Sequence, residues 1–266
     1  MKDLSNDTMV HIKRGDIEYL QFRRLLKYED KISHCYTLRG KSNDYKDIFG
    51  NNYELLYNEL GLDYSKFKRI EHQIHSDKVE VLDDLNKKYT EIDGLLTNID
   101  GASLSLRFAD CTPIFLYDPE KKVIGNIHSG WRGTTQKIAS KAVKRMIEEY
   151  GCNKDDIIAC IGPAIGKCHF EVSEDVKEIF KTTFSYLLNE DKFIYNGEAK
   201  NGEKKYFIDT NIINVKLLGE AGLKKENIIE SNICTVCNKE YMHSYRADKE
   251  FSGRNTAIIG LKELEM

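Results

Sequence analysis

The chain has 266 residues, of which 41% are hydrophobic and 31% are charged. This balance excludes collagen-like, low-complexity and disordered chains, because it leaves enough apolar side chains for a packed core. The formal net charge of −3 gives the chain as a whole no attraction for nucleic acid or for an anionic membrane, so we expect neither as a partner. A local basic pocket for a small anion stays open.

The sequence gives no sign of a membrane or secretory location. No apolar run approaches the roughly 18 residues that cross a bilayer, and the polar segment 1–10 lacks the apolar centre of a secretory signal. We therefore expect a cytoplasmic protein. In that reducing compartment its 7 cysteines are expected to be buried thiols, metal ligands or a nucleophile rather than disulfides.

The hydrophobic pattern predicts more strands than helices. In chain order, it first predicts strands over 103–109, where apolar residues alternate, over 113–117 and over 123–127. A helix over 138–150 and a strand over 155–161 follow. The last predicted elements are a helix that begins at Asp209 and closes at Gly222, and a strand over 257–261. Gly151 stands where the first helix should end. Because the strands cluster instead of alternating with helices, the pattern favours an α+β fold.

No internal repeat and no Gly/Ser-rich or Pro-rich linker divides the chain, so we expect a single domain over residues 1–266. No G-x-G-x-x-G opens a helix after a predicted strand, and no G-x-x-x-x-G-K-[ST] occurs. Nucleotide binding of the Rossmann or P-loop kind is therefore not indicated.

Residues that can carry chemistry concentrate between positions 93 and 135, close to predicted strand ends, where side chains can meet at one rim. Cys111 is either a thiolate that acts as metal ligand or nucleophile, or a small buried side chain. His75 and His128 are likewise either ligands or structural histidines. His75 follows an alternating stretch, residues 69–75, which is typical of a strand that ends at this histidine. Their separations from Cys111, 36 and 17 residues, match no short metal motif, so spacing alone leaves both interpretations open.

The only tryptophan, Trp131, stands between Gly130 and Arg132, ahead of the predicted helix. Gly130 lets the backbone approach a ligand closely, and free N–H groups near Thr134 and Thr135 would favour an anion such as phosphate. Arg132 would add a forked donor to that anion. The alternative is a capped helix whose tryptophan packs into the core.

Further along, His169-Phe170-Glu171 and Cys234-Thr-Val-Cys237 are similar to parts of the zinc deaminase signature. Residue 233 is Ile where that signature has Pro, and more than 60 residues separate the two segments. The Cys234/Cys237 pair is therefore half of a zinc site, a redox pair or, by default, two free thiols, because the second C-x-x-C of a structural zinc site is missing.

Eight short motifs, in order over most of the chain, resemble the laccase-domain family, which was first described as polyphenol oxidases and is now regarded as metal-dependent purine nucleoside phosphorylases. The motifs are Gln-Ile-His-Ser-Asp-Lys-Val (73–79), Asp-Gly-Leu-Leu-Thr (93–97), Ala-Asp-Cys-Thr-Pro (109–113), His-Ser-Gly-Trp-Arg-Gly-Thr (128–134), Ile-Gly-Pro-Ala-Ile-Gly (161–166), Cys-Thr (234–235), Ser-Tyr-Arg (244–246) and Ser-Gly-Arg (252–254). Thr37-Leu38-Arg39 is also similar to a family motif near the N-terminus.

The resemblance implies that His75, Cys111 and His128 are zinc ligands, with copper as the alternative metal. It implies a four-layer α/β/β/α fold with mixed sheets, related to the catalytic domain of cytotoxic necrotizing factor. Among the matching positions, Asp110 is expected to act in catalysis with the three ligands. The residues expected to bind substrate are Arg39, Gln73, Gly130, Arg132 and Arg246.

Two imidazoles and one thiolate leave a fourth position open on zinc, and zinc can lower the pKa of a coordinated water to about 7. Hydroxide that attacks C6 of adenosine would give inosine and ammonia. Phosphate that attacks ribose C1 would instead give ribose 1-phosphate and free base. Asp110 could then stabilise an oxocarbenium-like sugar or orient a histidine.

We therefore expect a zinc-dependent purine nucleoside phosphorylase with adenosine deaminase activity. Its substrates would be inorganic phosphate and adenosine, inosine, guanosine or methylthioadenosine. The alternatives are a copper-dependent phenol oxidase, a cysteine hydrolase that uses Cys111, and a non-enzymatic scaffold. The sequence leaves the oligomeric state open.

Overall fold

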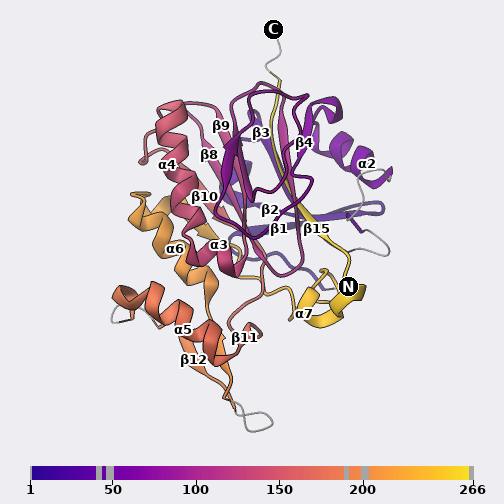
Figure 1. The fold of residues 1–266 in the computed structure, drawn as a ribbon. Helices are drawn as coiled ribbons and strands as arrows, with labels where there is room; N and C mark the ends of the chain where they lie inside the picture. Colours follow the sequence, from indigo (N-terminus) through magenta and orange to yellow (C-terminus); the bar gives the residue numbers. More distant parts are fainter. Residues whose placement is uncertain (1, 40–43, 46–50, 189–191, 199–203, 264–266) are drawn as a thin grey trace.

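The computed structural model describes residues 2–39, 44–45, 51–188, 192–198 and 204–263. Two six-stranded sheets lie face to face, and a smaller three-stranded sheet stands apart (Figure 1). In spatial order the first sheet contains β1 (Met9–Arg14), β2 (Ile17–Phe22), β3 (Ile32–Thr37), β15 (Asn255–Leu261), β7 (Ser103–Phe108) and β4 (Phe67–Arg69). The second contains β14 (Ile228–Glu230), β10 (Ile158–Ile161), β8 (Thr112–Asp118), β9 (Val123–Ser129), β6 (Gly94–Thr97) and β5 (Val79–Val81).

Both large sheets are mixed. β4 pairs with β7 in parallel in the first sheet, as β14 does with β10 and β5 with β6 in the second, while the other pairs are antiparallel. The small sheet has the order β11 (Glu171–Val172), β13 (Tyr206–Ile208) and β12 (Ile194–Asn196). With α5 it projects at the foot of Figure 1.

The helices are short, and most cover the outer faces of the two large sheets. They are α1 (Arg23–Leu26), α2 (Asn51–Leu60), α3 (Trp131–Thr135), α4 (Ile138–Tyr150), α5 (Glu174–Thr183), α6 (Thr210–Glu220) and α7 (Tyr245–Asp248). Single 3₁₀ turns occur as η1 (Tyr64–Lys66), η2 (Ser185–Leu187), η3 (Lys225–Asn227) and η4 (Lys249–Phe251).

The apolar residues divide into three clusters that define the layers. Phe115 of β8 lies in the cluster between the two sheets, whereas its neighbour Ile114 lies in the cluster under α4, α5 and α6. On the other side, Tyr53 and Tyr57 of α2 pack on Ile258 of β15. The order is therefore helix, sheet, sheet, helix, and strands such as β8 are apolar throughout because both faces are covered.

Local sequence signals explain the two main helices. The α4 helix ends at Gly151, whose φ of +64° is the left-handed cap that glycine adopts without steric cost. The α6 helix begins after Asp209, whose side chain accepts a hydrogen bond from the N–H of Ile212. Both helices therefore occur where the sequence predicts them, and the α+β class with mixed sheets is confirmed.

Three sequence expectations need correction. The strand expected over 155–161 begins only at Ile158, because residues 154–156 form a turn. Residues 69–75 do not continue as a strand beyond Arg69, and His75 lies in a loop with a φ of +62°. Asp93 stands immediately before β6 rather than at the end of a strand. Within the described ranges, no helix combines the length and apolarity that a membrane span requires.

Candidate metal centre and its pocket

Three side chains from separate parts of the chain meet beside the second sheet. His75 comes from the loop before β5, Cys111 from the turn between β7 and β8, and His128 from β9. The antiparallel pairing of β8 with β9 puts Pro113 opposite His128, which brings the Cys111 turn to the end of β9. Strand pairing therefore brings together residues that are far apart in the sequence.

The ligand atoms of these three residues all lie within 4.8 Å of one another. The Sγ of Cys111 is 3.6 Å from Nε2 of His75. The rings of His75 and His128 stand edge to face, with centroids 4.8 Å apart and an angle of 77°. A tetrahedral zinc ion bonded to one sulfur and one nitrogen holds these atoms about 3.5 Å apart, so the donor set fits a single metal ion.

Asp93, which is fully buried, orients two of the three donors. Its carboxylate faces Nδ1 of His128 at 2.8 Å and accepts the backbone N–H of His75 at 3.0 Å. It also accepts the N–H and the hydroxyl of Ser76. Because Nδ1 of His128 faces this carboxylate, Nε2 is the ring nitrogen available to a metal.

Charge and burial oppose each other at this cluster. Burial alone would raise the pKa of the Cys111 thiol, but His128 and His75 outweigh it and lower that pKa to about 6. Burial also works against a charged His128, yet Cys111 and Asp93 together raise the pKa of its imidazole to about 9. The pKa of Asp93 is lowered because His128 and Ser76 overcome the effect of burial. The protein groups alone thus favour a thiolate, the form that binds metals.

The backbone around the cluster is shaped to let the donors meet. Asp110 has a φ of +84° and His75 has a φ of +62°. Residues other than glycine rarely adopt this region of backbone conformation. A Cβ atom at Gly130 would come 2.6 Å from Cδ2 of His75 and 3.4 Å from the sulfur of Cys111. Glycine at this position therefore leaves room for the His75 ring.

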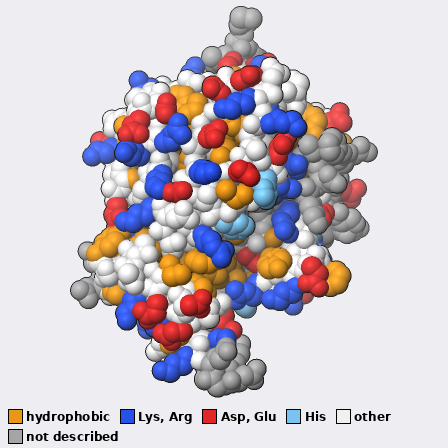
Figure 2. Space-filling view, in the orientation of Figure 1, with side chains coloured by type: hydrophobic (Ala, Val, Ile, Leu, Met, Phe, Trp, Pro, Cys, Tyr) orange, Lys and Arg blue, Asp and Glu red, His pale blue; other side chains and the backbone are white. Residues whose placement is uncertain are grey.

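The cluster opens into a cavity of about 540 Å³, the size range of small-molecule sites. Its wall includes four arginines, Arg107, Arg132, Arg246 and Arg254, and the aromatic residues Trp131, Phe170 and Tyr245. Figure 2 shows histidine side chains on this face of the molecule, beside basic and hydrophobic ones. A basic, partly aromatic wall suits an anion joined to, or beside, a flat ring.

Asp110 also lines the cavity, but its carboxylate is occupied by protein donors. The hydroxyl of Thr235 donates to Oδ1, and the backbone N–H of Arg246 donates to Oδ2 at 2.6 Å. The carbonyl of Asp110 accepts the N–H of Ile165. The carboxylate that faces a histidine is Asp93 instead.

The five positions expected to bind substrate fall into two groups. Gln73, Arg132 and Arg246 line the cavity, and Gly130 lies against His75 and Cys111. The Gln73 amide, however, exchanges two hydrogen bonds with the backbone of Arg107.

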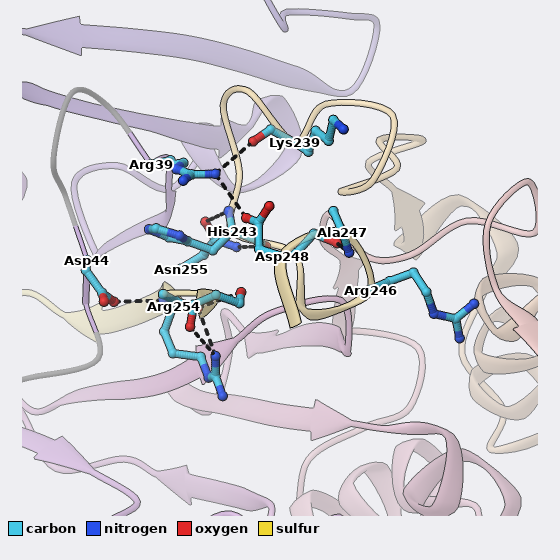
Figure 3. A network of polar contacts seen from close by, with 12 residues as sticks. Arg39, Asp44, Lys239, His243, Arg246, Ala247, Asp248, Arg254 and Asn255 are labelled. Atoms are coloured by element: carbon cyan, nitrogen blue, oxygen red, sulfur yellow. Dashed lines mark hydrogen bonds and ion pairs between the residues drawn. The ribbon is translucent and has the colours of Figure 1, made fainter. Parts of the chain in front are cut away.

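Arg39 does not line the cavity. It forms an ion pair with Asp248 and donates to the carbonyl of Lys239, while the guanidinium of Arg246 extends away from this pair (Figure 3). The structure therefore separates Arg39 from the other positions.

The backbone N–H of Thr134, in the turn after Gly130, is not available to an anion, although the sequence predicts that it is. The α3 helix already begins at Trp131, so the N–H of Thr134 donates to the carbonyl of Gly130 and is not free for an anion. The N–H groups without an intrahelical acceptor are those of residues 131–133. Trp131 both packs near Phe180 and lines the cavity, with Arg132 stacked 4.3 Å from its ring.

Sequence reasoning missed part of this site. Asp93 belongs to one of the recognised motifs but has no role predicted from sequence, and neither do the cavity residues Arg107, Phe170 and Arg254. Arg107 carried a weak signal, because it is the one charged residue in a strand whose other polar positions are serines. The role of Asp93 carried no local signal, since its partners His75 and His128 are 18 and 35 residues away.

Comparisons with known proteins agree with this picture. The family described as "Multi-copper polyphenol oxidoreductase laccase" matches residues 29–262. The chain is 36% identical to "Purine nucleoside phosphorylase YlmD" of Bacillus subtilis (strain 168) over 171 residues. This alignment covers 64% of this chain and 59% of that protein. It is 30% identical to "Purine nucleoside phosphorylase LACC1" of Mus musculus over 228 residues, and this alignment covers 84% of this chain and 50% of that protein. The chain thus spans only about half to three fifths of these two relatives.

Among solved structures, the crystal structure of Bacillus licheniformis hypothetical protein YfiH aligns with a TM-score of 0.79 and 27% identity, over 95% of this chain and 99% of that one. The fold and the His/Cys cluster in a basic cavity define a candidate metalloenzyme with an α+β fold. The family match makes the assignment specific: the chain belongs to the family of multi-copper polyphenol oxidoreductase laccases, whose relatives here are named purine nucleoside phosphorylases.

Proposed function

We propose that this protein is a zinc-dependent purine nucleoside phosphorylase that also deaminates adenosine. The observation that carries the proposal is the cluster of His75, Cys111 and His128 in a cavity whose wall holds four arginines. The relatives named purine nucleoside phosphorylase support this choice of reaction. Adenosine, inosine, guanosine and methylthioadenosine are the candidate nucleosides.

In this proposal His75, Cys111 and His128 would hold the zinc ion through Nε2, Sγ and Nε2. When bound, zinc would supply Lewis-acid chemistry toward an oxygen atom. Asp93 holds the His128 ring and the His75 backbone in place, so the two nitrogens keep their direction without substrate. Cys111 contributes the thiolate that its histidine neighbours favour.

The arginines of the cavity wall bind the phosphate. Arg132 is the first candidate because it is exposed and lies at the start of α3, where the first N–H groups have no acceptor within the helix. Arg246 is the second; it stands 5.8 Å from the ring of Phe170, which offers a flat face to the purine. Phosphate and base would then occupy neighbouring parts of one cavity.

Phosphorolysis forms a bond between a phosphate oxygen and ribose C1 while the bond from C1 to the purine nitrogen breaks. The purine leaves with the electron pair and takes up a proton, and ribose 1-phosphate remains. Arginines that neutralise the phosphate allow it to approach the sugar in the required orientation. We assign Asp110 a positioning role, because its two oxygens already hold Thr235 and Arg246.

Incubation of adenosine with and without phosphate tests this function. We expect ribose 1-phosphate in the same amount as the free bases, adenine plus hypoxanthine, only when phosphate is present, together with some inosine from deamination. Base release that ignores phosphate would indicate a hydrolase. Oxygen uptake with phenols would indicate the copper oxidase, and full activity after chelation would indicate the cysteine hydrolase.

Four further expectations belong to this proposal. We propose that residues 1–266 act as one domain, because both large sheets share one apolar cluster. We propose a cytoplasmic location, where the seven cysteines would stay reduced. The relation to the cytotoxic necrotizing factor domain, and zinc rather than copper as the metal, remain predictions.

A further inference from the structure

A second group of metal-ligand side chains lies in another part of the molecule. Cys168 and His169 belong to the turn between β10 and β11, and Cys234 and Cys237 belong to the turns after β14. The ligand atoms of these four residues all lie within 4.8 Å of one another. In the described part of the chain this is the one further group of this kind, and the proposed activity makes no use of it.

Four of the six distances between the donor atoms are close to those of a tetrahedral zinc site, and all six are at most 4.8 Å. Sγ of Cys168 and Sγ of Cys237 are 3.6 Å apart. From Nδ1 of His169 the sulfurs of Cys168, Cys237 and Cys234 lie at 3.2, 3.5 and 3.7 Å. Zinc bonded to sulfur at about 2.3 Å and to nitrogen at about 2.05 Å places sulfur atoms about 3.8 Å apart and sulfur and nitrogen about 3.5 Å apart.

The backbone arranges the donors without help from a metal. Ala164 pairs with Cys234 in a parallel bridge, and the N–H of Gly166 points at the sulfur of Cys234 at 3.3 Å. The N–H and the side chain of Asn238 both donate to the carbonyl of Cys234, which closes the turn that carries Cys237. A tight turn that carries Cys237, together with an N–H from the other segment directed at the sulfur of Cys234, is suited to a thiolate ligand pair.

Three cysteines and one histidine are a donor set that zinc prefers, and sets of four cysteines, or of three cysteines and one histidine, are typical of structural zinc sites. A divalent cation placed among the sulfurs would bind them as thiolates and release their protons.

We propose that Cys168, His169, Cys234 and Cys237 bind a structural zinc ion. Three thiolates and one imidazole fill all four positions, so this site has no open place for substrate. The four donors come from two segments about 65 residues apart, so the ion would clip the turn before β11 to the segment after β14.

This clip would support one wall of the cavity. The carbonyl of His169 accepts a hydrogen bond from Nη1 of Arg246 at 2.8 Å, and the next residue, Phe170, lines the cavity. On the other segment, Thr235 donates to Asp110. The ligands are therefore adjacent in the sequence to residues that shape the cavity.

Metal analysis of the full-length protein, purified without chelators and loaded with zinc, tests the proposal. We expect two zinc ions per chain, one ion in Cys111→Ser, and one ion in a Cys168→Ser/Cys237→Ser double variant. Cys152→Ala, a buried cysteine outside both groups, should keep two. If the double variant keeps as much zinc as the unchanged protein, the proposal is wrong. Because Cys111→Ser isolates the second site, its zinc is counted whether or not the proposed activity exists.

Two measurements guard against a variant that fails to fold. His169→Cys keeps four ligands and should retain the second ion, whereas His169→Ala should lose it or bind it much more weakly. Cobalt bound to Cys111→Ser should show the strong sulfur-to-metal absorption of a tetrahedral site with several thiolates. A thiol count of five instead of seven in the denatured, metal-free protein would reveal a disulfide in place of the zinc site and overturn the proposal.

Discussion

At the scale of single residues, the candidate site depends on Asp93. This carboxylate is fully buried, and its two oxygens hold His128, Ser76 and the backbone of His75. A carboxylate that orients a metal-ligating histidine fixes its tautomer and strengthens it as a donor. The direction of the two imidazoles therefore depends on one residue that does not itself line the cavity.

Asp93→Asn tests this dependence. An amide has no negative charge, and its NH2 group would face a group that now donates a hydrogen bond to Asp93. We therefore expect the zinc affinity to fall roughly 10- to 100-fold. Competition with a coloured chelator measures it, in a chain that also carries Cys168→Ser and Cys237→Ser so that one site contributes. Asp100→Asn, in the exposed turn before β7, is the matched control and should bind zinc normally. Unchanged affinity in Asp93→Asn would contradict the assignment.

The phosphate role of Arg132 gives a second prediction. Its guanidinium is exposed, stacks on Trp131 at 4.3 Å and reaches the cavity. Arg132→Ala should raise KM for phosphate roughly tenfold, about 1.4 kcal/mol, with a smaller change in KM for the nucleoside. Arg14→Ala, which removes an exposed arginine on β1, should change neither constant. Equal KM values for phosphate in both variants would remove Arg132 from the phosphate site.

At the scale of elements, β3 contributes a histidine to the interior between the sheets. His34 is buried against the rings of Phe22 and Phe115, and its Nε2 accepts the backbone N–H of Phe22 at 2.7 Å. Burial lowers its pKa to about 3. The folded protein therefore keeps this imidazole neutral far below the pH at which it is protonated in the unfolded chain.

This histidine makes stability depend on pH. The pKa of His34 is lower in the folded protein than in the unfolded chain. Its contribution to the free energy of unfolding is therefore complete above about pH 6.5. This contribution is lost as the pH falls toward 3, at about 1.4 kcal/mol per pH unit. His34→Gln can still accept the N–H of Phe22 and cannot titrate. Urea unfolding measures how far the free energy of unfolding falls from pH 7 to pH 5. We expect this fall to be about 2 kcal/mol smaller in the variant than in the unchanged protein. Equal drops would show that His34 is protonated without cost in the fold.

Two glycines near helix ends offer a matched pair. Gly151 ends α4 with a φ of +64°, whereas Gly219 lies within α6, and an added Cβ meets nothing within 4 Å at either place. Gly151→Ala should lower the free energy of unfolding by about 1 kcal/mol because of backbone strain. Gly219→Ala should raise it by roughly 0.5 kcal/mol through helix propensity. Urea unfolding distinguishes them, and effects of the same sign would contradict the explanation.

The two main helices and the central strands were predictable, whereas the N-terminal strands β1–β3 and the small sheet were not. Apolar spacing and two caps, Asp209 and Gly151, placed α4 and α6, because these signals are local in the sequence. The loop that carries His75 was not predicted, since its alternating residues match a strand while its backbone turns to bring the N–H of His75 to Asp93. That turn depends on a partner that no local pattern identifies.

At the scale of the whole molecule, the same limit applies to the two metal clusters. The motif resemblance supplied His75, Cys111 and His128 together, which spacing alone had left ambiguous. The cluster of Cys234 and Cys237 with Cys168 and His169 was missed, because sequence reasoning looked for a second C-x-x-C pair. The structure supplies an adjacent Cys-His pair from a distant turn, joined through the bridge between Ala164 and Cys234.

The central claim is that the cluster of His75, Cys111 and His128 binds the metal on which phosphate-dependent nucleoside cleavage depends. The most direct measurement is the formation of ribose 1-phosphate by chelator-treated protein as zinc is added back, for the unchanged chain and for Cys111→Ser. We predict that activity returns with bound zinc in the unchanged chain and stays absent in Cys111→Ser, although the variant still binds zinc at its other cluster. Equal, zinc-independent formation of ribose 1-phosphate by both proteins would contradict the claim.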